Sequence, residues 1–248
     1  MLENLNPQKV FHYFEEISAI PRGSGNIEAI GDYCMKFAES HGLKAIKETC
    51  GSVIIYADGT GGYENCKPVI LQGHLDMVCE KRADCNKDME NEAIDLRTDG
   101  VWVWAEGTTL GGDDGIAIAY ILALLDSPEI PHPPIEALLT ADEETGMTGA
   151  EELDGSLLSG RTLINIDSEE EGYLTVSCAG GVRCCCEYQL EFTDTEDGMC
   201  AVDIEIDKLL GGHSGVEIHK HRLNAHKILA DVLNYVYKRA PFFICDIM

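Results

Sequence analysis

The sequence predicts an α/β fold in which a mostly parallel sheet has helices on both faces, followed by the start of an α+β unit. Short apolar runs of strand length alternate along the chain with longer segments whose apolar residues recur every three or four positions. That alternation is typical of a sheet with buried faces that helices cover. The 248 residues, 45% of them hydrophobic, are enough to form such a core.

The same patterns place the individual elements. Asn6 and Pro7 form a helix start, and Val10, Phe14 and Ile17 continue it at helical spacing. Further helices are expected over residues 26–40, 116–125 and 223–239. Strands are expected over residues 43–47, 53–56, 69–71, 102–104, 135–140 and 163–166.

The pattern changes after Gly180 and Gly181. Residues 182–192 and 202–206 each predict a strand, with a polar loop between them and the last helix after them. We therefore expect one domain over residues 1–182 and the beginning of a second domain over residues 183–248.

Composition narrows the class of protein. The net charge of −26 repels nucleic acid and anionic membranes and is compatible with bound cations, although acidic surfaces most often serve solubility alone. No stretch approaches 18 apolar residues and no signal peptide begins the chain, so we expect a cytoplasmic protein without a membrane partner.

The 11 cysteines contain no C-x-x-C pair, which predicts reduced and mostly buried thiols.

Three of the apolar strands lead directly into histidine or acidic residues. These are His74 and Asp76 after the first strand, Glu143 and Glu144 after the second, and Asp167 after the third. Ligands of open α/β sheets bind outside the carboxyl ends of the strands. One such acid alone is more simply a solvated loop residue, but three strand ends together predict a single crevice.

A further acidic pair, Asp113 and Asp114, stands between glycines at the start of an apolar helix. Its charge would repel a phosphate and suits a cation. One histidine with several carboxylates is a ligand set for zinc or manganese. In the spacing His74-x-Asp76 the aspartate can orient the imidazole. The adjacent glutamates can divide two tasks, metal coordination and proton transfer from a water.

Six motifs resemble, in order and spacing, the bacterial aminoacyl-histidine (cytosol non-specific) dipeptidases of the M20 family of co-catalytic zinc peptidases. They are VILQGHLDMVCEK, GTTLGGDDGIAIA, ALLTADEETGM, LINIDSEEEG, SCAGG and GGHSGVEIH. The resemblance reaches about residue 240 and corresponds to the N-terminal portion of a family member. It implies a zinc-peptidase-like catalytic domain over residues 1–182, and the beginning of a lid and dimerisation domain over residues 183–248.

The resemblance also implies a metal site. Two zinc ions, replaceable by manganese or cobalt, would be bound by four residues of this chain. His74 and Asp167 would hold the first ion, Asp113 would bridge both ions in a cis peptide with the next residue, and Glu144 would hold the second. The fifth ligand of the family is missing from this chain.

Other roles come from the same resemblance. Glu143 would be the general base, and Asp76 would be the hydrogen-bond partner of His74. His213 would be the lid histidine that reaches across a dimer interface towards the partner's substrate. The implied function is hydrolysis of dipeptides, either Xaa-His or non-specific, by a homodimer.

Two other functions stay open. An N-acyl-amino-acid deacylase of the same family would use the same metal residues. A non-catalytic, truncated relative could fold and bind cations without turnover. Substrate choice depends on parts of the family that this chain does not cover.

We expect the 248-residue chain by itself to hydrolyse dipeptides poorly. The second ion would keep only Glu144 and Asp113, and a site with two protein ligands leaves a tetrahedral ion half open to water. Metal analysis should therefore find about one zinc ion per chain, the number that a site with three protein ligands retains. An aminoacyl-histidine dipeptide should be cleaved slowly until the C-terminal half is supplied. Rapid cleavage by the chain alone would contradict this expectation.

Overall fold

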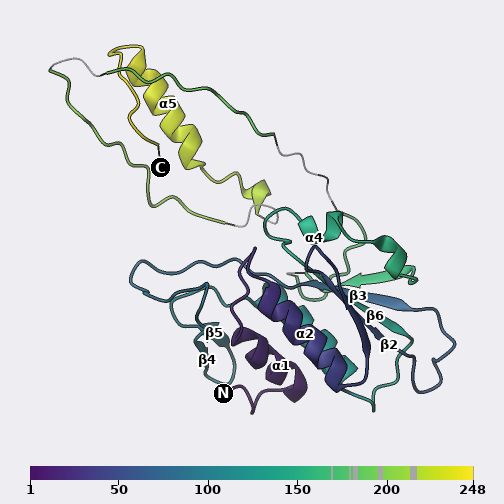
Figure 1. Ribbon diagram of the computed structural model, residues 1–248. Coiled ribbons are helices and arrows are strands. Elements are labelled where there is room, and N and C mark those ends of the chain that lie inside the picture. Colours follow the sequence, from purple (N-terminus) through teal and green to yellow (C-terminus); the bar gives the residue numbers. More distant parts are fainter. Residues whose placement is uncertain (169, 179, 181–183, 195–197, 213–216, 248) are drawn as a thin grey trace. The chain divides into compact units, whose positions relative to one another are not determined.

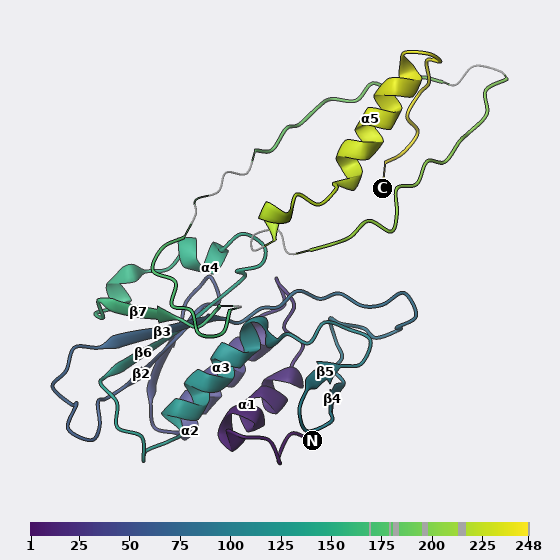
Figure 2. The same cartoon turned by 180° about the vertical axis from the view of Figure 1, so that it is seen from behind.

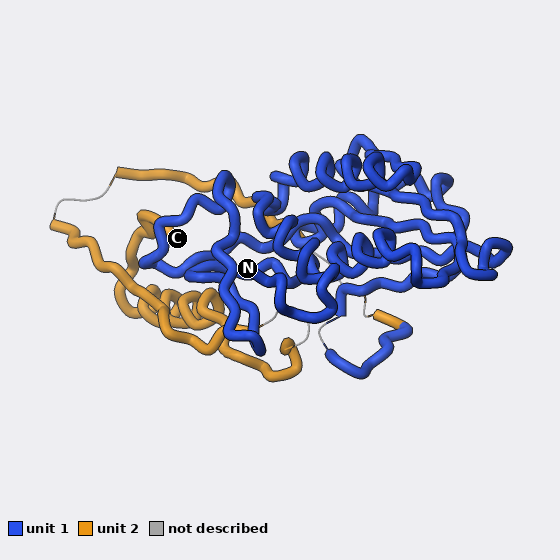
Figure 3. The backbone as a smooth tube through the Cα atoms, turned by 90° about the horizontal axis from the view of Figure 1, so that it is seen from below, with its two compact units in different colours: residues 1–176 blue, residues 177–248 orange. Residues whose placement is uncertain are grey.

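The structure is a computed structural model that describes residues 1–168, 170–178, 180, 184–194, 198–212 and 217–247. The chain divides into two units, Met1–Val176 and Ser177–Met248 (Figure 3). The boundary predicted between residues 182 and 183 falls outside the described residues. The catalytic and lid assignments of the two parts therefore stay predictions.

The first unit contains a five-stranded sheet in the order β1-β2-β6-β3-β7 (Figure 1). Its strands are β1 (Lys44–Lys47), β2 (Val53–Ala57), β3 (Val69–His74), β6 (Ile135–Thr140) and β7 (Thr162–Asn165). The central strand β3 pairs in parallel with both β6 and β7, whereas β2 is antiparallel to β1 and to β6. The α/β class is confirmed, and the sheet is mixed. A separate hairpin is formed by β4 (Leu96–Thr98) and β5 (Val103–Ala105).

Three helices, α1 (Gln8–Ser18), α2 (Glu28–Ser40) and α3 (Gly112–Leu125), pack on one face of this sheet (Figure 2). Side chains alternate between the faces of a strand, and Val53, Ile55 and Leu139 point into this main core. The other face is smaller and is covered by the segment containing α4 (Thr148–Glu151) and the short helix η1 (Gly155–Leu157). The second face thus has less helix than we expected. No helix of the described residues is long and apolar enough to cross a membrane.

The start of α3 departs from regular helix. Gly111 has φ of 69°, a left-handed conformation that glycine adopts without steric cost. Asp113 and Asp114 have non-helical backbone angles, so regular helix begins after them, as predicted from residue 116. The peptide bond between the two aspartates is cis, which confirms the expectation from the resemblance.

The described part of the second unit contains the short helix η2 (Ile218–Lys220) and helix α5 (Ala225–Tyr237). The helix α5 was predicted. The strands predicted over 182–192 and 202–206 do not form in the described residues of those ranges. Strands are stable only when paired on a buried face, and none of the described residues in 177–247 is buried.

The thiols differ from the prediction in their burial. All 11 cysteines are free, but eight of them are exposed, so the expectation of mostly buried thiols is wrong. Six of the eight exposed cysteines belong to the second unit, where the described residues form no core. Cys34 on α2 is the fully buried case.

Candidate metal centre

The carboxyl ends of β3, β6 and β7 lie at one edge of the sheet because these strands are parallel. His74 is the last residue of β3 and is in register with Thr140, the last residue of β6. The loop after β6 carries Glu143 and Glu144, and Asp167 follows β7 by two residues. The sheet thus brings the three predicted strand ends together.

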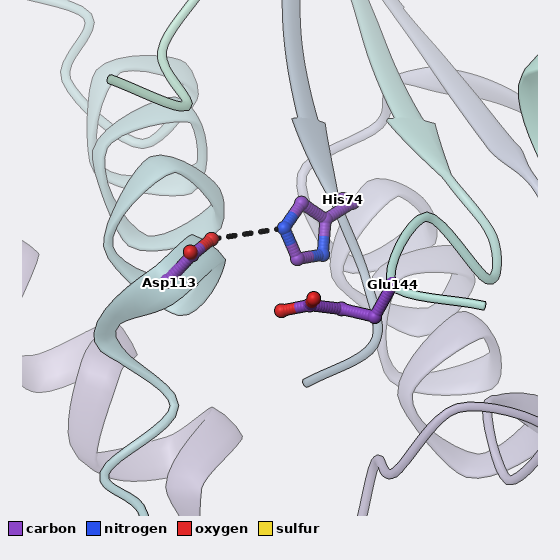
Figure 4. Close-up of side chains that lie close together, drawn as sticks. All are labelled: His74, Asp113 and Glu144. Carbon is purple, nitrogen blue, oxygen red and sulfur yellow. Dashed lines mark hydrogen bonds and ion pairs between the residues drawn. The ribbon is translucent and has the colours of Figure 1, made fainter. Parts of the chain in front are cut away.

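Potential metal-ligating atoms gather around His74 in two groups. One group is His74, Asp113 and Glu144, and the other is His74, Asp114 and Asp167; within each group the atoms lie within 4.8 Å of one another. Figure 4 shows the carboxylates of Asp113 and Glu144 beside the imidazole ring. The three predicted carboxylate ligands, Asp113, Glu144 and Asp167, therefore all lie close to the fourth, His74. An imidazole nitrogen with carboxylate oxygens is a donor set that fits zinc or manganese.

The imidazole of His74 is held from both sides. Its Nε2 lies 3.0 Å from Oδ1 of Asp113, and its Nδ1 lies 3.3 Å from Oδ1 of Asp76. Its main-chain N–H donates to Oδ2 of Asp114 at 3.0 Å. Asp76 holds Nδ1 in place, and Nε2 therefore faces the carboxylate of Asp113. Metal-ligating histidines are held in the same way, with one ring nitrogen hydrogen-bonded and the other directed at the metal.

Asp76 connects the loops of the centre. It is fully buried and accepts hydrogen bonds from the Ser24 hydroxyl at 2.7 Å and from the main-chain N–H of Glu143 at 3.0 Å. The main-chain N–H of Glu144 donates at 3.3 Å to Oδ2 of Asp76, the oxygen that also accepts from Ser24. The carboxylate therefore ties the end of β3, which carries His74, to the loop after β6.

Charge in the centre is dominated by carboxylates. Burial alone lowers the pKa of His74, but hydrogen bonds with Asp113 and Asp76 outweigh burial and raise this pKa to about 10. Burial raises the pKa of Asp114 to about 7, and the charges of Asp167 and Asp113 act in the same direction. Without a metal ion, protons are thus the cations that reduce the mutual repulsion of the carboxylates.

The glutamate pair also has perturbed acidity. Burial raises the pKa of Glu143, and the nearby carboxylate of Asp167 adds to the effect. Burial and the charge of Asp113 raise the pKa of Glu144. A carboxyl group whose pKa lies above its usual range accepts a proton more readily, as a general base must.

A cavity of about 670 Å³ opens beside Glu144. It is lined by that glutamate and by residues 23–26, 77–79 and 89–91, with the apolar side chains of Met77, Val78 and Met89 among them. Pockets of about 300–1,000 Å³ are typical of small-molecule sites. The cavity, whose lining is partly apolar and partly polar, therefore has room for a small molecule beside Glu144.

Two residues near the metal centre, Asp114 and Arg22, have no individual role in the sequence-based prediction of the site. Asp114 lies in the second group with His74 and Asp167, whereas the resemblance implies a role only for its neighbour Asp113. Arg22, 2% exposed, contacts the centre, and no sequence pattern indicated it. The predicted lid histidine, His213, lies outside the described residues.

Comparisons with known proteins also indicate similarity to peptidases, although no protein-family model matches the chain. The chain is 40% identical over 232 residues to the cytosol non-specific dipeptidase of Escherichia coli, a match that covers 94% of this chain and 48% of that protein. The crystal structure of aminoacylhistidine dipeptidase from Vibrio alginolyticus is 44% identical, with a TM-score of 0.67. The chain therefore resembles these dipeptidases over 94% of its own length.

The match is partial in length. The chain spans about half the length of the Escherichia coli relative, and the Vibrio structure matches over 69% of this chain and 35% of its own. A tripeptidase from Staphylococcus aureus, with 23% identity and a TM-score of 0.55, covers 67% of this chain and 44% of its own and shares the fold. The relatives' activity is therefore a property of proteins longer than this chain.

Metal affinity should rise with pH. A cation needs neutral His74 and ionised carboxylates, yet in the cation-free protein the pKa of His74 is about 10 and that of Asp114 about 7. Raising the pH from about 6 to about 8 removes competing protons, and each proton displaced changes affinity by about tenfold per pH unit. Zinc titration calorimetry over this range checks the slope, which Asp114→Asn should reduce. An affinity independent of pH would contradict this account.

Proposed function

We propose that this chain carries the metal-binding core of a dipeptidase, in which His74, Asp113, Glu144 and Asp167 hold two zinc ions. The observation that supports it is the gathering of these carboxylates around His74, in a chain that is 40% identical to a dipeptidase. The names of both relatives favour dipeptide hydrolysis over removal of an acyl group from N-acyl amino acids. Zinc ions bound there would polarise the peptide carbonyl and lower the pKa of the attacking water.

The residues of the chain would perform the remaining tasks. Asp76 keeps the imidazole of His74 in one orientation. Glu143 takes a proton from the attacking water and passes it to the leaving amine, a role that its raised pKa supports. The cavity beside Glu144 receives the substrate.

The role that we propose for the second unit is supported by its sequence and not by its structure. We propose that residues 183–248 begin a lid domain through which the complete protein forms a homodimer. In that dimer His213 would contact substrate held by the partner. The support is the GGHSG motif, at residues 211–215, within the 94% of the chain that matches the Escherichia coli protein. Because that relative is named for the cytosol, we propose the same location for this protein.

Glu143→Gln should separate activity from metal content. In a dipeptide-hydrolysing protein that contains this chain, loss of the general base should lower kcat by about 10²–10⁴-fold. Zinc content should stay unchanged, because Glu143 is not a ligand in our assignment. The matched control is Glu144→Gln, which should lower zinc content and activity together. A Glu143→Gln protein that loses zinc in proportion to activity would reverse the two roles.

A further inference from the structure

Arg22 is a buried arginine that contacts two loops of the metal centre. It follows α1 and is 2% exposed. Its Nη1 donates to the main-chain oxygens of Leu75 at 3.0 Å and Asp76 at 2.9 Å, and its Nη2 donates to the main-chain oxygen of Gly111. The guanidinium therefore joins the loop after β3 to the loop before α3.

Two glycines leave the space that this guanidinium fills. A Cβ atom on Gly111 would lie 2.6 Å from Nη2 of Arg22, and one on Gly115 would lie 2.5 Å from the same atom. Both distances are too short for any side chain. The close approach of Arg22 thus accounts for Gly115 and contributes, together with Met77, to the need for glycine at position 111.

The charge of Arg22 also suits its position. Burial lowers its pKa to about 10, which still leaves it positively charged near neutral pH, and the carboxylates of Asp114 and Asp76 oppose the lowering. A buried charge is costly unless neighbouring groups of opposite charge and hydrogen-bond acceptors compensate it. Here the carboxylates of the metal centre and three carbonyl oxygens compensate the two Nη groups, whereas the buried Nε has no hydrogen-bond partner among the described residues.

The residues after Arg22 contact the same centre. The main-chain oxygen of Arg22 accepts from the N–H of Met77 at 3.0 Å, and the Ser24 hydroxyl donates to Asp76 at 2.7 Å. The main-chain N–H of Gly25 donates to Asp142, just before the glutamate pair, at 2.6 Å. Residues 22–25 thus touch the loop after β3 and the loop after β6, in addition to the α3 start.

We propose that Arg22 is a positioning residue of the metal centre, and this proposal rests on the metal-binding function proposed above. Its planar guanidinium fixes the end of β3, which carries His74, relative to the start of α3, which carries Asp113. It contacts the main chain of these segments and is not itself a ligand. A lysine ammonium cannot reproduce a rigid fork with three acceptors, so the charge alone is not sufficient.

The test compares Arg22→Lys, which keeps the charge, with Arg97→Lys as the matched control, because Arg97 is an exposed residue of β4. Zinc affinity of the folded chain should fall by about 10–100-fold in Arg22→Lys, the range for residues that orient metal ligands, and stay unchanged in Arg97→Lys. A merely structural arginine would lower the melting temperature without changing zinc affinity. A folded Arg22→Lys protein with wild-type zinc affinity would overturn the proposal.

A second variant covers the case in which Arg22→Lys does not fold. Gly115→Ala keeps Arg22 but displaces its guanidinium, and alanine by itself favours helix. We expect the same loss of zinc affinity, and unchanged affinity in the folded variant would overturn the proposal.

Hydrogen exchange of the metal-free protein separates the two proposals. In the Arg22 or Gly115 variant, exchange should increase in residues 74–78 and 110–116 and not in β2. If the wild-type chain bound no zinc, the proposed function would fail, and exchange alone would decide the role of Arg22. Unchanged exchange in both segments would then overturn it.

Discussion

The structure depends on holding several carboxylates together around one buried histidine, against their mutual repulsion. Asp113, Asp114 and Glu144 offer oxygens close to His74, and their like charges disfavour one another in a partly buried site. The parallel pairing of β6, β3 and β7 places the loops, while Asp76 and Arg22 hold them through hydrogen bonds. A divalent cation is the natural counter-charge for such a group. The same geometry therefore explains both the acidic motifs and the buried arginine.

Much of this centre could be predicted because its signals are local. The run over residues 135–140 is mostly apolar and of strand length, and it forms β6 with the same bounds. The strand that ends at His74 and the apolar helix after Asp114 are recognisable from the sequence in the same way. Since ligand sites of α/β sheets lie at the carboxyl ends of strands, the convergence of the acidic residues followed from the strand assignment.

Other features depend on contacts between distant segments and could not be predicted. The antiparallel direction of β2 depends on its pairing with β1 and β6, not on its own sequence. Arg22 is 89 residues from Gly111 along the chain, and only the folded structure shows that they are hydrogen-bonded. The strands expected after residue 182 have suitable apolar patterns, but a pattern supplies no pairing partner, and the described residues of those segments form no strand and none of them is buried.

The most direct measurement is zinc-edge anomalous diffraction from crystals of the zinc-loaded chain. The account predicts an anomalous peak at about 2.0–2.1 Å from Nε2 of His74, with carboxylate oxygens of Asp113 or Asp167 at about 2.0–2.2 Å. A zinc ion absent from His74 and bound instead at exposed histidines such as His219 and His221 would contradict it.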